Sequence, residues 1–191
     1  MTADPLQHPR PLLDHRGPWT EEDYLALPEI DGLRLELVDG ELIMSPWPDN
    51  AHQVMVGYLY RELDRLVPEH LAVLPGGNVR LGPGRINIPD VLVLREFSDV
   101  AVNEAADVLL AAEVVSDSGR ARDRILKPGL NAEAGIGWYL VVERKPRLQL
   151  LLFRVDRGTY AEHARAGKGE LLDLPSLGIT LEADALLRRR G

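Results

Sequence analysis

The sequence predicts an α/β fold with a mixed central β-sheet, and three observations support this. Short apolar runs typical of buried strands, clearest at residues 86–94 and 108–115, alternate with segments whose apolar residues recur at helical spacing. The strand–helix–strand order across residues 108–143 is typical of parallel, buried strands. The chain has 191 residues, of which 45% are hydrophobic. That is enough for one domain with a sizeable core.

The N-terminal region predicts a flexible segment followed by a short helix. Residues 1–18 are rich in Pro, His, Arg and Asp and show no periodicity, so we expect them to be flexible. Thr20 has the chemistry of a helix N-cap, and the acids at 21–23 oppose the positive end of the helix dipole. We expect this helix to end before Pro28.

A β-hairpin and a longer helix are predicted next. Residues 33–38 alternate strictly between apolar and polar side chains, and Asp39-Gly40 separates them from the apolar run at 41–44. Alternation interrupted by Asp-Gly is a strong hairpin signal. Apolar residues then recur at helical spacing from about Asp49 until Pro68 ends the pattern.

The remainder of the chain predicts further strands around one more helix. The helix is expected over residues 120–135, with Pro128-Gly129 kinking it or marking its start. A connection at 95–107 is expected to lead into the strand that carries Glu113. The expected strands lie near 71–74, 77–82, 86–94, 108–115, 137–143, 148–155, 158–164 and 169–173. We expect one domain over residues 19–187 and a solvated basic tail at 188–191.

Composition excludes several classes of function. There are no cysteines, which removes disulfides, thiolate metal sites and cysteine nucleophiles and fits a cytoplasmic location. No apolar run approaches the roughly 20 residues of a membrane span, so no membrane partner is expected. The net charge of -8 argues against a general nucleic-acid coat, which needs many Lys and Arg contacts to phosphate. A local basic groove stays open.

Two acids give the sequence its first claim to chemistry. Asp90 and Glu113 each lie in a short apolar run that predicts a buried strand. Carboxylates are rarely buried unless they are paired or bound to a metal. If Asp90 lies opposite Glu113, the two converge on one cation, and Mg²⁺ suits such an oxygen site. The alternative interpretation is that both acids mark strand ends at the solvent edge.

Other candidates carry weaker signals. Glu36 alternates with Leu35 and Leu37, so its ordinary place is the solvated face of a strand. Lys127 could contact a phosphate, or form a routine surface pair with Asp123 four residues earlier. His52 lies at the edge of a helical apolar stripe, where a structural role is more common than a catalytic one. The segment 120–127 has a local excess of positive charge from Arg120, Arg122, Arg124 and Lys127. This excess is either a phosphate-binding patch or a solvated helix face.

The chain resembles the Uma-two family of putative restriction endonucleases, within the PD-(D/E)XK nuclease superfamily. The order and spacing of the matching pieces carry the resemblance over roughly residues 18–187. These pieces are Trp19–Tyr24, Leu35–Leu42, His52, Pro89-Asp90-Val91, Glu113–Ser116, Asp123–Pro128, Ala132–Ile136 and Trp138-Tyr139. The resemblance implies a restriction-endonuclease-like core, in which helices flank the mixed sheet after an N-terminal helix and hairpin.

The resemblance also implies roles for individual residues. Asp90 and Glu113 would bind Mg²⁺ or Mn²⁺, with the carbonyl of Val115 or Val114 completing the shell. Val115 stands where the superfamily usually carries its lysine, and Lys127 on the following helix would replace that lysine. Glu36 would join them as the upstream acid.

The resemblance further implies the substrate and its contacts. Asn131 stands where the family commonly has tyrosine, and with His52 and the three arginines it would line the substrate site. DNA would be the substrate, and a homodimer suits cleavage of both strands.

Three functions therefore compete at this point. The first is a Mg²⁺-dependent phosphodiesterase acting on DNA, an enzyme that needs both Asp90 and Glu113. The second is a nuclease fold repurposed for a small molecule, which the acidic balance, the missing strand lysine and Asn131 favour. The third is a catalytically silent binding or dimerisation module. Fold resemblance alone does not choose among them, because function resides in the site.

Overall fold

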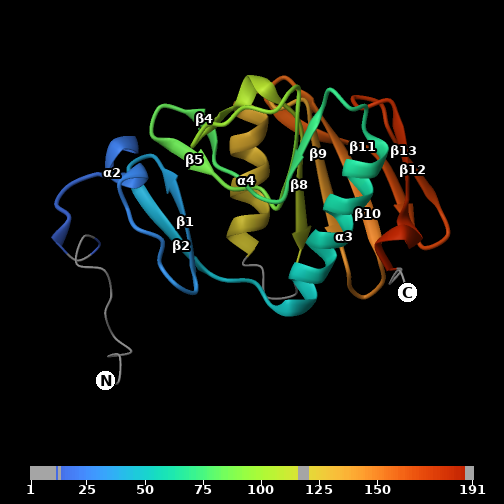
Figure 1. Ribbon diagram of the computed structural model, residues 1–191, viewed down its shortest axis with the longest axis horizontal. Coiled ribbons are helices and arrows are strands. Elements are labelled where there is room, and N and C mark those ends of the chain that lie inside the picture. Colours follow the sequence, from blue (N-terminus) through green and yellow to red (C-terminus); the bar gives the residue numbers. More distant parts are fainter. Residues whose placement is uncertain (1–11, 13, 116–120, 188–191) are drawn as a thin grey trace.

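Two mixed β-sheets and a small number of helices make up the protein (Figure 1). The structure, a computed structural model, describes residues 12, 14–115 and 121–187, and of residues 121–125 it describes the backbone alone. The five-stranded sheet has the order β2-β1-β5-β4-β7, formed by β1 Leu33–Val38, β2 Glu41–Pro46, β4 Val79–Gly82, β5 Arg85–Asn87 and β7 Asn103–Glu104. The sequence predicted one central sheet, so the division into two is a correction.

The six-stranded sheet is the larger of the two. Its order is β11-β10-β9-β8-β6-β3, formed by β3 Ala72–Leu74, β6 Val91–Leu94, β8 Val108–Val115, β9 Trp138–Glu143, β10 Gln149–Asp156 and β11 Thr159–Gly167. A separate pair consists of β12 Leu171–Leu174 and β13 Ile179–Glu182, the latter not predicted. The helical segments are α2 Glu21–Leu25, α3 Asn50–Leu66, α4 Ala121–Glu133 and the 3-10 turns η1 Ala105–Asp107 and η2 Ala183–Leu187.

Local sequence chemistry explains the N-terminal elements. The Thr20 side chain accepts a hydrogen bond from the Asp23 N–H, and Asp23 reaches back to the Thr20 N–H, so a capping box starts α2. Asp39 and Gly40 both have positive φ, as a two-residue hairpin turn requires, and Val38 pairs with Glu41 across it. The predicted helix start at Asp49 is also confirmed, since its side chain accepts from the His52 N–H.

The predicted continuous strand over 86–94 is wrong in an informative way. β5 ends at Asn87 and β6 begins at Val91, and the two strands belong to different sheets. Pro89 has no N–H to donate to a strand ladder, so the chain leaves one sheet there and enters the other. Asp90 therefore lies at the junction between the sheets rather than within a strand.

Helix α4 occupies the space between the two sheets (Figure 1). Strands β8 and β9 flank it in sequence and pair in parallel, as the strand–helix–strand pattern predicted. The helix runs from Ala121 through Pro128, so that proline does not mark its start. One buried cluster joins α4 to both sheets and contains Val79, Leu81, Leu92, Leu94, Val108, Ala111, Leu130, Ile136 and Tyr139.

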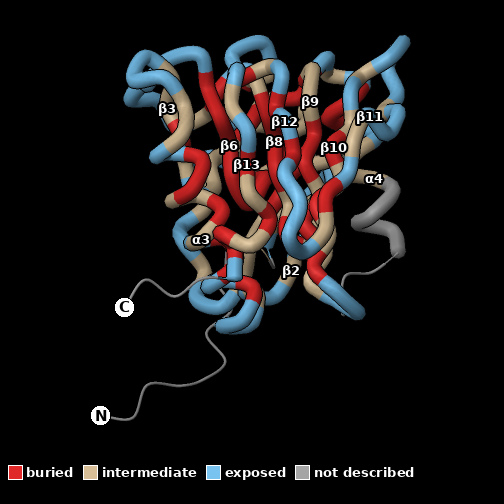
Figure 2. The backbone as a smooth tube through the Cα atoms, turned by 90° about the vertical axis from the view of Figure 1, so that its right-hand side faces the viewer, coloured by how far each residue is buried: buried red, intermediate tan, exposed pale blue. Residues whose placement is uncertain are grey.

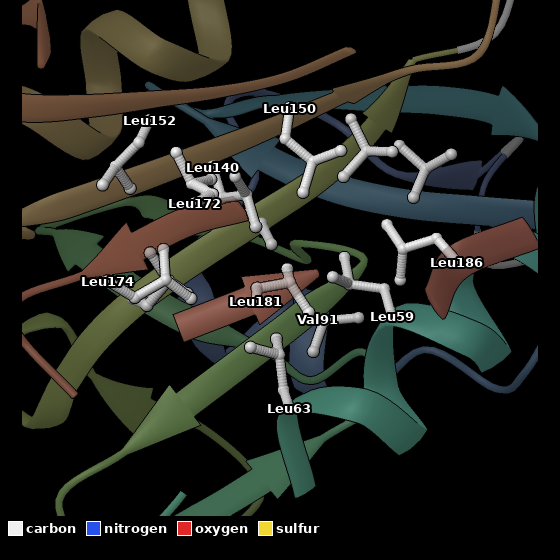
Figure 3. Packing of buried hydrophobic residues seen from close by; sticks show 14 of the residues in the cluster. Leu59, Leu63, Val91, Leu140, Leu150, Leu152, Leu172, Leu174, Leu181 and Leu186 are labelled. Atoms are coloured by element: carbon white, nitrogen blue, oxygen red, sulfur yellow. The ribbon is translucent and has the colours of Figure 1, made fainter. Parts of the chain in front are cut away.

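The main core lies on the opposite face of the six-stranded sheet. There α3, the β12–β13 pair and η2 cover β6, β8, β9 and β10, whose central stretches are buried (Figure 2). Figure 3 shows Leu59 and Leu63 of α3 close to Val91 and Leu181. The order of layers is therefore five-stranded sheet, α4, six-stranded sheet, and α3 with the β12–β13 pair. No helix among the described residues has the length and apolar character to cross a membrane.

The layer of α3 gives a first prediction about stability. Leu59 is fully buried, so Leu59→Ala should lower the free energy of unfolding by about 2–5 kcal/mol through lost burial and a residual cavity. Val54 on the same helix is 50% exposed, and Val54→Ala should change it by less than about 0.5 kcal/mol. Urea unfolding followed by circular dichroism measures both. Equal losses in the two variants would contradict the packing of α3.

Candidate functional site

The structure brings Asp90 and Glu113 together. Val91 of β6 pairs with Ala112 of β8 in antiparallel orientation. Asp90, which precedes Val91, is therefore a neighbour of Glu113, which follows Ala112. The two carboxyl groups are close enough for the charge of Asp90 to raise the pKa of Glu113, and Asp90 is only 5% exposed. The alternative of two separate strand ends in solvent is thereby wrong for this pair.

Positive and neutral donors surround Asp90. Its Oδ1 lies 2.9 Å from Arg34 Nη1, and its Oδ2 accepts the Val114 N–H at 2.8 Å. His52 Nε2 lies 3.3 Å from the same Oδ2. Burial alone would raise the pKa of Asp90, but the hydrogen bond from His52 and the charge of Arg34 hold that pKa well below its usual range. Asp90 is therefore a fixed negative charge.

Glu113 behaves in the opposite way. Burial raises the pKa of Glu113, the charge of Asp90 raises it further, and the nearby Lys127 and Arg34 do not cancel the two effects. Its Oε1 is buried without a hydrogen-bond partner, and Lys127 Nζ lies 3.5 Å away. The acid pair thus retains one proton to higher pH than two separate carboxyl groups would.

Glu36 is buried, which corrects the expectation of a solvated position. It is 4% exposed because the face of β1 that carries it looks toward α4 rather than toward water. Its Oε1 lies 2.9 Å from Lys127 Nζ and accepts the Ile88 N–H at 2.9 Å. Ile88 lies in the segment between β5 and β6, where its N–H is free for this bond. The same segment carries Asp90, so it positions both acids.

Lys127 pairs with two acids of the site rather than acting only as a surface residue. Burial alone would lower its pKa, but the charges of Glu113 and Glu36 raise the pKa above its ordinary value. It is therefore an ammonium at any physiological pH. Asn131, one helical turn later, is fully buried and donates from Nδ2 to the Lys127 carbonyl at 2.8 Å. This bond supports the turn of α4 that presents Lys127.

Two cavities meet at this cluster. The first, here called the acid pocket, has a volume of about 400 Å³, and its lining includes Glu113, Val115, Lys127, Tyr139, Phe153 and Tyr160. The second, here called the loop pocket, has about 520 Å³ and lies against the loop over residues 27–33, Trp47 and Gln53. Both are lined by Arg34, His52 and Asp90, which form the wall between them.

The remaining candidates have varied positions. His52 is buried beside Asp90, and its Nδ1 has no hydrogen-bond partner. Arg120 lies outside the described residues, and so do the side chains of Arg122 and Arg124.

Sequence reasoning missed Arg34, although a signal for it existed. Arg34 and Glu36 are two residues apart on β1 and therefore share one face of the strand. A site that includes Glu36 is therefore expected to include Arg34 as well. Tyr139 and Tyr160, stacked with ring centroids 5.2 Å apart, were also not predicted as pocket residues. Their positions depend on how β9 and β11 are placed, which no local motif indicates.

The donors suit a hard divalent cation. Two carboxylates and a nearby backbone carbonyl are oxygen ligands, and the buried, unbonded Glu113 Oε1 is the kind of atom that a cation would satisfy. Such a cation would take the place of the proton between the acids. In the described residues no group of three or more His, Cys, Asp or Glu side chains forms a metal site, so the protein would supply two side-chain ligands and water the rest.

The protein is a mixed α/β protein with two mixed sheets and few helices. The fold matches the crystal structure of a putative nuclease belonging to DUF820 from Anabaena variabilis ATCC 29413, with a TM-score of 0.72 and 16% identity over 88% of this chain and 97% of the other. The family model described as "Putative restriction endonuclease" matches residues 21–185, and the chain belongs to this family, Uma2. No curated protein matches the chain. The resemblance inferred from the sequence is confirmed.

The acid pair predicts an unusual pH dependence. The pKa of Glu113 in the folded protein lies above its ordinary value of 4.5, so the unfolded chain releases this proton first and the wild type loses stability as pH rises. Glu113→Gln lacks that loss. Its free energy of unfolding relative to wild type should grow by up to about 1.4 kcal/mol per pH unit above 4.5 until the folded protein also ionises.

Urea unfolding in EDTA at about pH 5 and about pH 7 measures this difference, because chelation removes any metal contribution. Glu69→Gln, at an exposed acid, is the control and should follow the wild type at both pH values. If the free energy of unfolding of Glu113→Gln relative to wild type falls as pH rises, ionisation of Glu113 does not destabilise the folded protein.

Lys127 gives a second prediction from the same cluster. Lys127→Met should cost about 3–5 kcal/mol of unfolding free energy, because it leaves buried Glu36 without its cation. Lys168→Met, at an exposed lysine, should be nearly neutral. Thermal and urea unfolding measure both. If Lys127→Met proves as stable as Lys168→Met, the ion pair with Glu36 does not exist in solution.

Proposed function

We propose that the protein is a Mg²⁺-dependent endonuclease with a restriction-endonuclease-like core that hydrolyses DNA phosphodiester bonds. One observation carries the proposal. Asp90 and Glu113 are neighbours where β6 meets β8, and they lie beside a lysine whose Nζ is 3.5 Å from Glu113 and 2.9 Å from Glu36, within a cavity open to a ligand. Membership of a family described as putative restriction endonucleases supports it.

Asp90, Glu113 and the carbonyl of Val115 would hold Mg²⁺ or Mn²⁺. When bound, the ion would polarise a phosphoryl oxygen and lower the pKa of a bound water. The protein prepares the two ligands in different ways. The Val114 N–H and His52 fix the Asp90 carboxylate, whereas Glu113 keeps one oxygen without a hydrogen bond. Such orientation of ligands by their neighbours increases metal affinity.

Cationic side chains would bind the phosphate. Lys127 remains protonated, so it would donate hydrogen bonds to a non-bridging oxygen and offset the charge that builds up on attack by water. Glu36 positions that ammonium and is itself held by the Ile88 N–H. The contacts to the phosphate backbone that the sequence predicts for Arg120, Arg122 and Arg124 belong to the same proposal, since these residues closely precede Lys127 in the sequence.

A second candidate function rests on a separate observation. One wall of the acid pocket consists of apolar and aromatic side chains, including Leu151, Phe153 and Tyr160, and Arg34 already neutralises Asp90. Enclosed apolar walls with a few polar groups are typical of sites for small molecules. A nuclease fold repurposed for a small organic substrate would use the same cavity without a cation. Stabilisation by small ligands but not by Mg²⁺ or Mn²⁺ in a thermal-shift assay would favour it.

Cleavage of supercoiled plasmid tests the first proposal. Wild type should nick and linearise the plasmid with Mg²⁺ or Mn²⁺ and not with EDTA. Asp90→Asn and Glu113→Gln should each reduce the rate of cleavage by about 100-fold or more, since each removes one carboxylate ligand of the cation that would stabilise the reacting phosphate. Asp99→Asn, at an exposed acid outside both pockets, is the matched control and should cleave at the wild-type rate.

Titration of Mn²⁺ by calorimetry accompanies this assay, and circular dichroism establishes that each variant is folded. Folded Asp90→Asn and Glu113→Gln should bind Mn²⁺ at least about 10-fold more weakly than wild type. If both variants cleave the plasmid at the wild-type rate, the reaction does not take place at Asp90 and Glu113.

A further inference from the structure

The loop pocket adjoins the proposed reaction centre. Arg34, His52 and Asp90 line it at one end and line the acid pocket on their other side. A substrate whose phosphate lies beside Glu113 and Lys127 therefore has a second cavity across this wall. The volume of about 520 Å³ falls in the range of small-ligand sites and leaves ample room for a flat heterocycle.

The rim of the loop pocket presents an anchored aromatic surface. Trp47 lies between β2 and α3 and is 63% exposed, which is unusual for so large an apolar side chain. Its backbone N–H donates to the Gly32 carbonyl at 2.9 Å, which fixes its backbone to the loop that also lines the pocket. A largely exposed indole whose backbone is fixed is suited to stack on another flat ring.

The charges around this pocket indicate which part of a nucleotide fits. Glu29 and Asp31 line it in addition to Asp90, and their negative charge repels phosphate. Carboxylates and side-chain amides do accept hydrogen bonds from the amino groups of nucleobases, and Gln53 adds such an amide. The lining therefore favours a base over a sugar-phosphate backbone.

We propose that the loop pocket binds one unstacked nucleobase adjoining the scissile phosphate, with Trp47 as its stacking partner, so that the preferred substrate is single-stranded DNA or an extrahelical nucleotide. This inference rests on the proposed nuclease function and names its substrate class. A base paired within a duplex cannot enter a cavity without leaving the stack, which costs free energy that a single strand does not spend.

The overall charge of the chain agrees with this preference. Binding of duplex DNA depends on many Lys and Arg contacts to phosphate, and this chain has a net charge of -8. Stacking of bases on aromatic side chains supplies affinity for single strands in a way that depends less on charge. The largely exposed Trp47 at the loop pocket is suited to the second kind of binding.

Fluorescence anisotropy tests the inference with a short labelled oligonucleotide of mixed sequence, as a single strand and as a blunt duplex. The protein carries Glu113→Gln so that binding is measured in Mg²⁺ without cutting. We expect the single strand to bind at least about 10-fold more tightly than the duplex. Adding Trp47→Ala should weaken single-strand binding by about 5- to 150-fold, the range that loss of one stacked base produces, and Trp47→Phe should retain most of it.

Phe97→Ala is the matched control, because Phe97 is another highly exposed aromatic residue and lines neither pocket. It should bind like its parent. Unchanged binding in Trp47→Ala, an equal loss in Phe97→Ala, or tighter binding of the duplex would each overturn the inference.

The two proposals fail in different ways. If the wild type cuts no DNA in Mg²⁺ yet binds single strands through Trp47, the nuclease function is lost and the base pocket stands. If the wild type cuts duplex plasmid and Trp47→Ala cuts it and single strands at the wild-type rate, the nuclease function stands and the base pocket is lost.

Discussion

The close approach of the Asp90 and Glu113 carboxyl groups is the constraint on which the rest of the site depends. Two like charges buried side by side cannot both ionise unless cations or hydrogen-bond donors surround them. The protein meets this condition with Arg34 and Lys127 from opposite sides and with a proton on the pair. Each of these groups comes from a different segment, so the tertiary fold is needed to keep the pair buried.

The separation into two sheets makes that arrangement feasible. Arg34 and Glu36 come from β1 of the five-stranded sheet, Glu113 from β8 of the six-stranded sheet, and Lys127 from the helix between them. The chain crosses from one sheet to the other at Pro89, and the crossing leaves the Ile88 N–H free to bond Glu36. A single continuous sheet would have used that N–H in its ladder and carried Asp90 away from β1.

Local chemistry predicted much of the fold, and long-range pairing accounts for what was missed. The cap at Thr20, the turn at Asp39-Gly40 and the parallel pair around α4 each follow from neighbouring residues, and all are observed. The division into two sheets depends on which strands meet. The burial of Glu36 depends on what covers its strand. Arg34 escaped notice because an arginine in an alternating strand normally faces water.

The wall between the two pockets links chemistry to recognition. Arg34 is paired with Asp90, and the proposed cation would compete directly with this guanidinium for the carboxylate. A guanidinium released from Asp90 lies between both pockets and is suited to a phosphate, because its planar donors match phosphate oxygens. Binding of the proposed cation and of a substrate phosphate would then favour each other, since each would satisfy a group that the other displaces.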